Sequence, residues 1–283
     1  MPKKLKHKSP APGKMVDVNG REMHVFTQGE GKYTYIFLSG SGTRYPTTDF
    51  KPLWSLLAKD NKVAVVEKAG YGWSDVSNNA PRDIDTLIQE SREALRQAEI
   101  HQPYILVPHS VSGLEALYWA QTYPDEVLAI IGLDMAFPEY YDHAKFPMWL
   151  IHFMVFLGAF TADMLNEAKI VKENAQKVKD KSLPLNIPIF SFISDGKFAR
   201  SAKINWLDMH KAHVEKFKIG KYKQLECGHY VHKFKADEIA AEIKQFTSAL
   251  KALGRKRLDI AQLHDYSHYH AHSMVLISLS AQA

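Results

Sequence analysis

The sequence predicts an α/β domain with a mostly parallel central sheet and helices on both faces. Two observations support this fold class: short, continuous apolar runs recur along the chain, and amphipathic segments separate them. Continuous apolar runs of this length are typical of strands that are buried on both faces of a parallel sheet. Helices that alternate with such strands cover the two faces of the sheet.

The expected elements follow from this periodicity. The strands are placed at residues 23–26, 35–38, 63–66, 103–107, 129–133, 187–193 and 222–225. The helices are placed at residues 50–57, 84–98, 113–122 and 236–253. In the second helix an apolar stripe contains Leu87, Ile88, Leu95 and Ala98. Gly254, after the last helix, is typical of a helix C-terminus.

Residues 136–186 interrupt the alternation of strands and helices. They contain no strand pattern and join a very apolar stretch, 148–157, to a polar helical stretch, 162–181. We interpret the segment as a helical cap insertion over the strand ends, because a simple crossover needs far fewer residues. An ordinary crossover with a buried helix is the alternative. The insertion divides the core of the domain into residues 15–135 and 187–254.

The two ends of the chain differ from this core. Residues 1–14 form a basic tail with five lysines and no acidic residue. Residues 255–283 lack caps and periodicity, so we expect a poorly ordered tail. Its histidines would permit metal binding, but no carboxylate or thiol cluster supports such a site: His264, His268, His270 and His272.

Composition and charge limit the class of protein. Of the 283 residues, 46% are apolar and 24% are charged, which suits a globular chain with a sizeable core and excludes a disordered or collagen-like one. Without the lysines of the basic tail, basic and acidic residues each number 31, so the body lacks the surplus that nucleic-acid binding needs. The tail itself would suit peripheral contact with a membrane surface. The sequence leaves the oligomeric state open.

The compartment is inferred from two features. Cys227 is the single cysteine, so no intramolecular disulfide forms, which fits a reducing compartment. No apolar core of a signal peptide follows the basic start, and the longest apolar stretch is too short and interrupted for a membrane span. We therefore predict a cytoplasmic protein. A membrane-tethered protein whose N-terminal anchor was removed is the alternative.

The strongest local signal lies at residues 104–120, where a strand, a sharp turn and a helix follow one another, with Ser110 at the turn. A hydroxyl beside a helix N-terminus suits a nucleophile, and the Val111 N–H would face the oxyanion of an acyl intermediate. A serine with a purely structural role in the turn is the alternative. The stretch resembles the G-x-S-x-G nucleophile elbow of the α/β-hydrolase family, with Pro108 and Ser112 at the glycine positions.

Two further segments strengthen the resemblance to α/β-hydrolases. Residues 36–43 resemble the family's oxyanion loop, with Ser39 in place of the usual histidine; Gly40 would let the backbone approach, and the Ser41 N–H would be the second oxyanion donor. Residues 67–75 are similar to the family's D-x-x-G-x-G-x-S-D loop, with Glu67 replacing aspartate. The resemblance gives this loop a structural role.

The last strand and the loop after it resemble the segment that carries the family's catalytic histidine. His229 takes that position and would be the general base. His232 is the rival, and the H-x-x-H spacing would suit a metal pair, although a polar residue near the site is the simpler interpretation. His210 and His213 form a second such pair, which we expect on a solvated helix face.

Two aspartates are candidates for the acid of a catalytic triad. Asp195 follows the expected seventh strand, where most members carry the acid, but stands two residues early. Asp134 follows the sixth strand, the other placement known in this fold. We favour Asp134, and either choice keeps the chain order Ser, Asp, His.

The resemblance, over residues 15–253, implies a serine hydrolase that cleaves a small-molecule acyl substrate and needs no metal or organic cofactor. A serine nucleophile argues against epoxide-hydrolase chemistry, which uses aspartate in this fold. Besides Gly40, we expect His109, Trp149 and Phe153 to contact substrate, and the apolar cap suggests a lipophilic ester. A cap that merely packs on the core is the alternative. The rival functions are a non-catalytic ligand-binding homologue and a membrane-surface hydrolase or acyltransferase.

Overall fold

The computed structural model describes residues 9–77, 80–144, 147–197, 199 and 204–253. The expected C-terminal tail with its histidines and most of the basic tail lie outside these residues. Within them, no helix is both long enough and apolar enough to cross a membrane.

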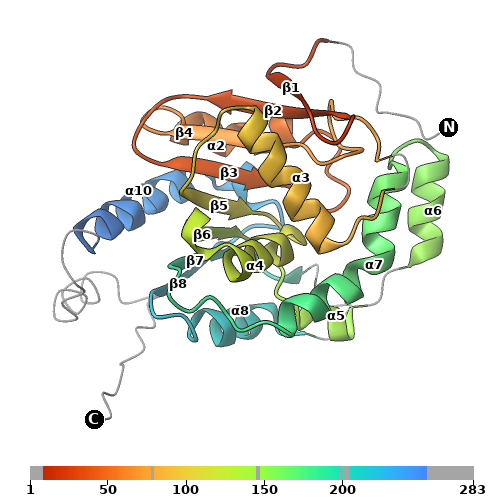
Figure 1. The fold of residues 1–283 in the computed structure, drawn as a ribbon. Helices are drawn as coiled ribbons and strands as arrows, with labels where there is room; N and C mark the ends of the chain where they lie inside the picture. Colours follow the sequence, from red (N-terminus) through yellow and green to blue (C-terminus); the bar gives the residue numbers. More distant parts are fainter. Residues whose placement is uncertain (1–8, 78–79, 145–146, 198, 200–203, 254–283) are drawn as a thin grey trace.

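The described residues form an eight-stranded sheet in the spatial order β1-β2-β4-β3-β5-β6-β7-β8 (Figure 1). The pairings β1–β2 and β2–β4 are antiparallel, and the others are parallel. The strands are β1 (Lys14–Asp17), β2 (Glu22–Gln28), β3 (Thr34–Leu38), β4 (Lys62–Val66), β5 (Tyr104–Pro108), β6 (Val127–Leu133), β7 (Ile189–Ile193) and β8 (Gly220–Gln224). Each expected strand overlaps one of these, and β1 is an additional strand.

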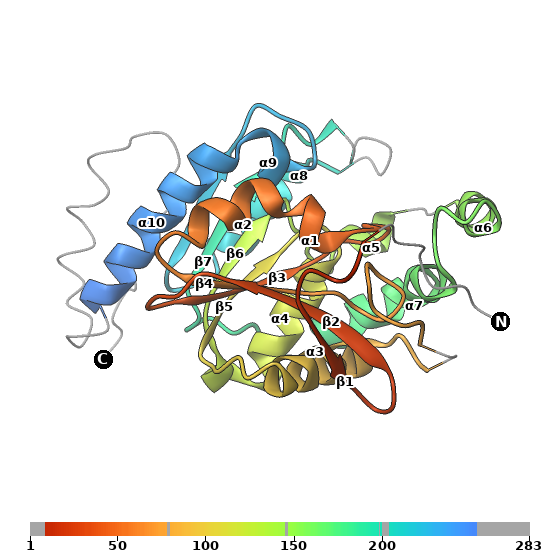
Figure 2. The ribbon, with the colours of Figure 1, turned by 90° about the horizontal axis from the view of Figure 1, so that it is seen from above.

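Both faces of the sheet are buried, as a doubly covered sheet requires. In β3, Ile36 and Leu38 belong to one hydrophobic cluster, and Tyr35 and Phe37 belong to the other. Helices pack on both clusters (Figure 2). On the first lie α3 (Ile84–Gln97), α4 (Ser112–Thr122) and α8 (Trp206–Val214); on the second lie α2 (Lys51–Leu57), α9 (Val231–Phe234) and α10 (Ala236–Leu253). The α/β fold class with helices on both faces is confirmed.

The segment between β6 and β7 is helical and, in its described residues, contains no strand. It carries α5 (Tyr140–His143), α6 (Met148–Phe156) and α7 (Ala162–Lys179); the short helices α1 (Pro46–Asp49) and η1 (Pro124–Glu126) lie elsewhere. Helix α7 packs on α4, α5 and α6. In Figure 1, α6 and α7 lie side by side at the edge of the domain, beyond the sheet.

The carboxyl ends of the parallel strands meet at one edge of the sheet. The chain leaves β3 at Leu38, β5 at Pro108 and β6 at Leu133, and an isolated bridge pairs His109, just after β5, with Leu133 at the end of β6. Open α/β sheets bind their ligands at this edge. The residues that follow these strands are therefore held close together.

Candidate active site

Ser110 lies on the sharp turn between β5 and α4. Its φ of 56° is in the left-handed region, which residues other than glycine rarely adopt. The Ser110 carbonyl accepts hydrogen bonds from the N–H groups of Gly113 (3.0 Å) and Ala136 (2.8 Å). A Cβ at Gly113 would lie 2.3 Å from the Ala136 carbonyl oxygen, so the close approach of turn and loop needs glycine there.

The two non-glycine positions around Ser110 are accommodated differently. The Ser112 hydroxyl lies 2.7 Å from the Leu38 carbonyl oxygen and accepts a hydrogen bond from the His109 N–H at 2.9 Å. This small polar side chain therefore ties the turn to the end of β3. Pro108 is the last residue of β5, and the next N–H, that of His109, donates to the Leu38 carbonyl at 3.0 Å.

His229 and Asp134 are in direct contact, although 95 residues separate them in the chain. The Nδ1 atom of His229 lies 2.6 Å from Oδ2 of Asp134. The other carboxylate oxygen, Oδ1, accepts hydrogen bonds from the Ser194 N–H and the Trp206 indole N–H, both at 2.7 Å. Asp134 is fully buried and its φ is 49°. Donors on both oxygens fix the orientation of this carboxylate and compensate its loss of water.

Asp195, the other candidate acid, has a different environment. Its carboxylate accepts a hydrogen bond from the Lys197 N–H at 3.1 Å and pairs with the Lys197 ammonium at 2.7 Å. The structure thus brings Asp134 onto the Nδ1 of His229 and places Asp195 in a turn with Lys197.

One cavity of about 200 Å³ is lined by four of the nine expected site residues. Ser110 and His229 both line it, together with Ser41 and Val111. Within the described residues, the N–H groups of Ser41 and Val111 donate to no other part of the chain. Most of the remaining wall is apolar and includes Ile84, Leu87, Leu114, Tyr140, Ile151 and Val171.

The four residues expected to contact substrate lie in different places. Gly40 packs against the turn, where a Cβ would lie 2.9 Å from that of Ser110. His109 is buried and does not line the cavity. Its Nε2 lies 3.2 Å from the His229 carbonyl oxygen, so it contacts the backbone of the loop that carries His229. Trp149 and Phe153 are 72% and 50% exposed and do not line the cavity; Ile151 of the same helix does. Their contact with substrate stays a prediction.

Burial controls the protonation of the histidine next to the site. It lowers the pKa of His109 well below the ordinary value, and the neighbouring imidazoles of His232 and His229 act in the same direction. A neutral His109 can pack in the interior without a counter-ion.

His232 is also buried. Its Nε2 lies 2.8 Å from Oδ2 of Asp49, so it contacts a carboxylate of α1. Among the described residues, no group of three or more His, Cys, Asp or Glu side chains could hold a metal ion.

The expectation that His210 and His213 lie on a solvated helix face is wrong. Both are buried in α8. His210 Nδ1 lies 2.8 Å from the Ser191 hydroxyl, and His213 stacks on Phe137 with ring centroids 4.1 Å apart. The spacing of three residues placed them on one side of the helix, but that side packs against the sheet and the loop after β6.

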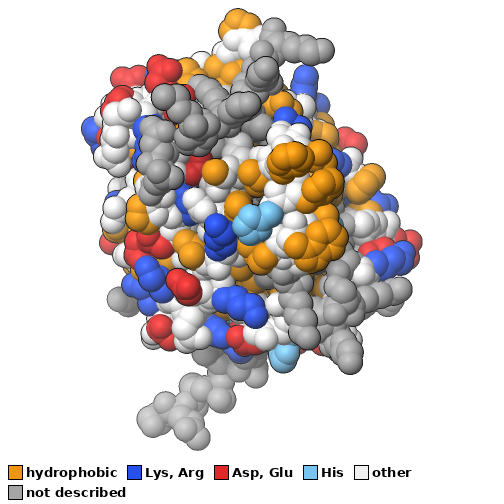
Figure 3. Space-filling model, turned by 90° about the vertical axis from the view of Figure 1, so that its right-hand side faces the viewer, with side chains coloured by type: hydrophobic (Ala, Val, Ile, Leu, Met, Phe, Trp, Pro, Cys, Tyr) orange, Lys and Arg blue, Asp and Glu red, His pale blue; other side chains and the backbone are white. Residues whose placement is uncertain are grey.

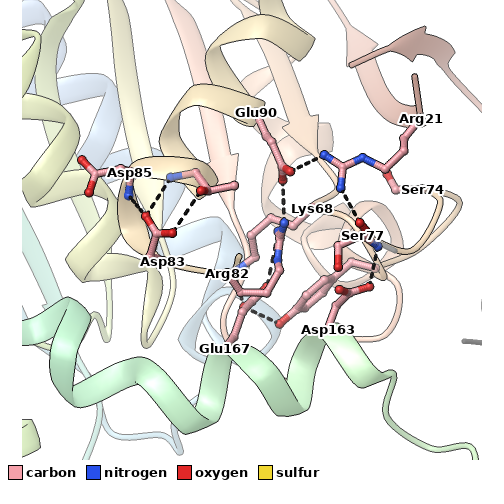
Figure 4. A network of polar contacts seen from close by, with 12 residues as sticks. Arg21, Lys68, Ser74, Ser77, Arg82, Asp83, Asp85, Glu90, Asp163 and Glu167 are labelled. Carbon is pink, nitrogen blue, oxygen red and sulfur yellow. Dashed lines mark hydrogen bonds and ion pairs between the residues drawn. The ribbon is translucent and has the colours of Figure 1, made fainter. Parts of the chain in front are cut away.

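Sequence reasoning missed a buried network of charged residues beside the cavity (Figure 4). Lys68 donates to Glu115 at 2.8 Å and to Glu167 at 3.0 Å, and Tyr71 donates to Glu167 at 2.8 Å. Arg82 pairs with Glu90 at 2.8 Å. Lys68 belongs to the loop already compared with the family's glycine loop, but its glutamate partners lie 47 and 99 residues further along the chain, so the sequence carried no signal for the network.

Comparisons with known proteins agree with this fold. No protein-family model matches the chain. The chain is 50% identical over 129 residues to the uncharacterised protein YbdG of Bacillus subtilis; the match covers 46% of this chain and 39% of that protein. The chain thus spans well under two thirds of the length of this relative.

Solved structures are similar over most of the chain. A protein of Pseudomonas aeruginosa described as a candidate epoxide hydrolase aligns with a TM-score of 0.65 and 15% identity, covering 84% of this chain and 96% of that one. An enol-lactonase of Burkholderia xenovorans aligns with a TM-score of 0.58 and 16% identity, covering 83% and 100%. The protein has the α/β-hydrolase fold.

Proposed function

We propose that this protein is a serine hydrolase that cleaves small to medium, lipophilic carboxylic esters through an acyl-enzyme on Ser110. One observation carries the proposal: Ser110 and His229 line the same cavity, and the Nδ1 of His229 contacts the buried Asp134. The enol-lactonase among the similar structures acts on an ester by its name, which supports the reaction class.

The mechanism assigns one task to each group. His229 Nε2 takes the hydroxyl proton of Ser110 as the oxygen attacks the ester carbonyl. Asp134 accepts the Nδ1–H, which fixes the tautomer and stabilises the imidazolium. The N–H groups of Ser41 and Val111 donate to the oxyanion. The intermediate collapses, the alcohol leaves with the proton of His229, and a water activated by His229 releases the acid.

The preference for a lipophilic ester rests on the largely apolar wall of the cavity. Its volume of about 200 Å³ favours short and medium chains. A series of p-nitrophenyl esters tests this: we expect kcat/KM to rise with chain length and then fall once the chain outgrows the cavity. A flat profile would remove the support for this substrate class.

Replacing the proposed nucleophile is the first test. We expect Ser110→Ala to lower kcat/KM for the best p-nitrophenyl ester at least about a thousandfold, as loss of a triad member does. Ser112→Ala is a matched control, because its hydroxyl bonds the backbone and not the cavity. Turnover by Ser110→Ala close to that of the native protein would refute the mechanism.

The choice of acid gives a second prediction. In Asp134→Asn the amide oxygen would keep the bonds from Ser194 and Trp206, so the amide N–H would face Nδ1 of His229 and force the proton onto Nε2. That tautomer cannot accept the Ser110 proton, so we expect kcat to fall about a thousandfold or more. Asp195→Asn is the control and should retain turnover. Loss of turnover in Asp195→Asn alone would transfer the role to Asp195.

A non-catalytic binding protein with this fold is the competing function. A fluorophosphonate probe separates the two, because it forms a covalent adduct only with an activated serine. The serine hydrolase is labelled, whereas a binding protein stays unlabelled while still showing affinity for esters.

We also propose that α6 contacts a lipid surface. Its residues Met148–Phe156 include no Asp, Glu, Lys or Arg, and Trp149, Phe153, Phe156 and the adjacent Leu157 are exposed. Figure 3 shows hydrophobic side chains gathered on the face of the molecule that carries α6. Exposed apolar groups of this extent mark contact sites, and the basic residues 1–14 would favour anionic lipids.

Vesicle co-sedimentation tests this contact. We expect binding to vesicles of phosphatidylcholine with phosphatidylserine, and we expect Phe156→Asp to weaken it. Phe234→Asp is a matched control, because Phe234 is also exposed but lies on α9. Equal binding by the two variants would rule out α6 as the contact.

A further inference from the structure

The junction between α6 and α7 packs on a glycine of the loop after β3. At Gly42, whose φ is 74°, a Cβ would lie 2.6 Å from Cζ, 3.0 Å from Cε1 and 3.3 Å from Cε2 of Phe160. Apart from the neighbours of Gly42 in the chain, these ring atoms are the nearest to that position. The end of the Phe160 ring is therefore in van der Waals contact with the Gly42 backbone, and this contact needs glycine.

Gly42 belongs to the tight turn that carries the Ser41 N–H. The Thr43 N–H donates to the Gly40 carbonyl at 3.4 Å, which closes a four-residue turn. Ser41 and Gly42 are its central residues, and a positive φ at the second of them is typical of a type II turn. Ser41 lines the cavity, so the position of its N–H there depends on how this turn is held.

Phe160 is itself held by the two helices that it joins. Its N–H donates to the Met154 carbonyl of α6 at 3.1 Å. Its side chain packs against a small hydrophobic cluster that contains the buried Tyr71 and Met164, the latter in α7. Phe160 therefore connects α6 and α7 to the loop after β3.

A second contact fixes the start of α7 to the core. At Gly70, whose φ is 79°, a Cβ would lie 2.5 Å from Oδ2 of Asp163 and 2.9 Å from Oγ1 of Thr161. The same Asp163 oxygen accepts a hydrogen bond from the Ser77 N–H at 2.9 Å (Figure 4). Because residues 161 and 163 contact the core in this way, Phe160 has little freedom to move away from the turn.

We propose that Phe160 is a positioning residue of the active site, because its ring holds the turn of residues 40–43 and thereby the Ser41 N–H. Phe160 does not line the cavity, so it acts through Ser41 and not by contact with the substrate. Helices α6 and α7 then contribute to the reaction step as well as to the cavity wall. This inference rests on the proposed function, which assigns the oxyanion to the Ser41 N–H.

Removal of the ring tests the inference through the hydrolysis of a p-nitrophenyl ester. We expect Phe160→Ala to lower kcat at least about tenfold, because a displacement of about 1 Å within a site can cost a hundredfold. KM should change less than about threefold, since the cavity wall is intact. Phe234→Ala is the matched control, because its ring is 65% exposed on α9, and it should retain turnover. Equal turnover by the two variants would overturn the inference.

A transition-state analogue separates positioning from a loss of folded protein. The Ser110 oxygen adds to the carbonyl carbon of pentyl trifluoromethyl ketone, His229 takes the hydroxyl proton, and the ketone oxygen becomes an oxyanion. Hexanamide has the same acyl chain but forms no oxyanion. We expect Phe160→Ala to weaken inhibition by the ketone about as much as it lowers kcat/KM and to leave the affinity for hexanamide unchanged. An equal loss for both compounds, or no loss for the ketone, would contradict the positioning role.

A cycle of two variants locates the effect at the contact with Gly42. Gly42→Ala adds a Cβ that overlaps the Phe160 ring, so it displaces either the ring or the turn. In the Phe160→Ala protein the overlap is absent and only the strain of the positive φ remains. We therefore expect Gly42→Ala to lower kcat at least about threefold less in the Phe160→Ala protein than in the native protein. Effects that simply multiply would show that the ring does not act through the turn, and would refute the inference.

Thermal denaturation shows whether each variant is folded. If Phe160→Ala does not fold, Phe160→Leu takes its place in the same measurements, because it shortens the side chain at the contact without emptying the cluster. Normal turnover by the folded variant would refute the positioning role and leave the hydrolase intact. A native protein that hydrolyses no ester and reacts with no fluorophosphonate would refute the hydrolase, and the role of Phe160 with it.

Discussion

Ser110 and Asp134 hold the same unusual backbone conformation at the ends of adjacent strands. Their φ values of 56° and 49° each cost on the order of 1–3 kcal/mol for a residue other than glycine. The interior supplies compensating contacts to both: the Ser110 carbonyl accepts two N–H bonds, and the Asp134 carboxylate accepts two more besides contacting His229. Strain of this kind concentrates at functional sites, which agrees with the roles proposed for them.

His210 gives a prediction for stability against pH. Burial lowers its pKa from 6.5 to about 4, so the folded protein resists protonation more than the unfolded chain does. The stability from a neutral His210 is complete above pH 6.5 and is lost as the pH falls toward 4, by roughly 3 kcal/mol. We expect His210→Gln to flatten the dependence of unfolding free energy on pH in this window. The unfolding free energy is measured by urea denaturation at several pH values. The same dependence on pH in both proteins between pH 6.5 and 4 would contradict the prediction.

At the scale of single residues, the sequence predicted the candidate site unevenly. Ser110 and His229 were proposed because each stands at a fixed place beside a strand. The choice between Asp134 and Asp195 depended on which carboxylate reaches Nδ1, a distance that strand counting does not give. The sequence could not place Trp149 and Phe153 relative to the cavity, because α6 is apolar on every side and its pattern does not indicate which side faces the cavity.

One side chain, Glu67, makes several of the contacts that hold the loop from Glu67 to Asp75. Glu67 Oε2 accepts from the Trp73 N–H at 2.7 Å, and Oε1 accepts from the Thr47 hydroxyl at 2.8 Å. His24 Nδ1 lies 3.0 Å from Oε2. The carboxylate thus joins the loop to α1 and β2, which agrees with a structural role.

Gly72 allows this loop to close over Glu67. Its φ is 47°, and a Cβ there would lie 1.7 Å from Glu67 Oε2. We expect Gly72→Ala to lower the free energy of unfolding by about 3 kcal/mol or more, from strain and overlap together. Gly20→Ala is a matched control, because Gly20 has a φ of 76° with open space around it, and it should cost only about 1 kcal/mol. Chemical denaturation measures both variants. Equal losses of unfolding free energy in Gly72→Ala and Gly20→Ala would show that the overlap at residue 72 is relieved without cost, and would contradict the prediction.

β1 was not predicted and α8 was expected to be solvated, for different reasons. β1 has four residues, of which one is buried, so it carries almost no hydrophobic pattern. The Asn19-Gly20 turn that joins it to β2 has φ values of 57° and 76° and was the signal available, since Asn-Gly favours a two-residue hairpin. In α8 only one of the four buried positions, Val214, is aliphatic; the others are Trp206, His210 and His213, so the helix lacks the aliphatic pattern typical of a core helix.

For the whole molecule, the sequence predicted what depends on local pattern. The parallel sheet and its two helical faces follow from apolar runs and their spacing, and both were confirmed. The charged network beside the cavity was not predicted, because Lys68, Glu115 and Glu167 lie on three elements separated by about fifty residues each. The packing of α4 against α7 brings Glu115 and Glu167 together, and Lys68 reaches both from the loop after β4.

The central claim is that Ser110 is a nucleophile activated by His229. Labelling with a fluorophosphonate, followed by peptide mass spectrometry, tests it most directly. The account predicts one adduct, on Ser110, that forms much more slowly in His229→Ala. No adduct in the native protein, an adduct on another residue, or an equal labelling rate in His229→Ala would contradict it.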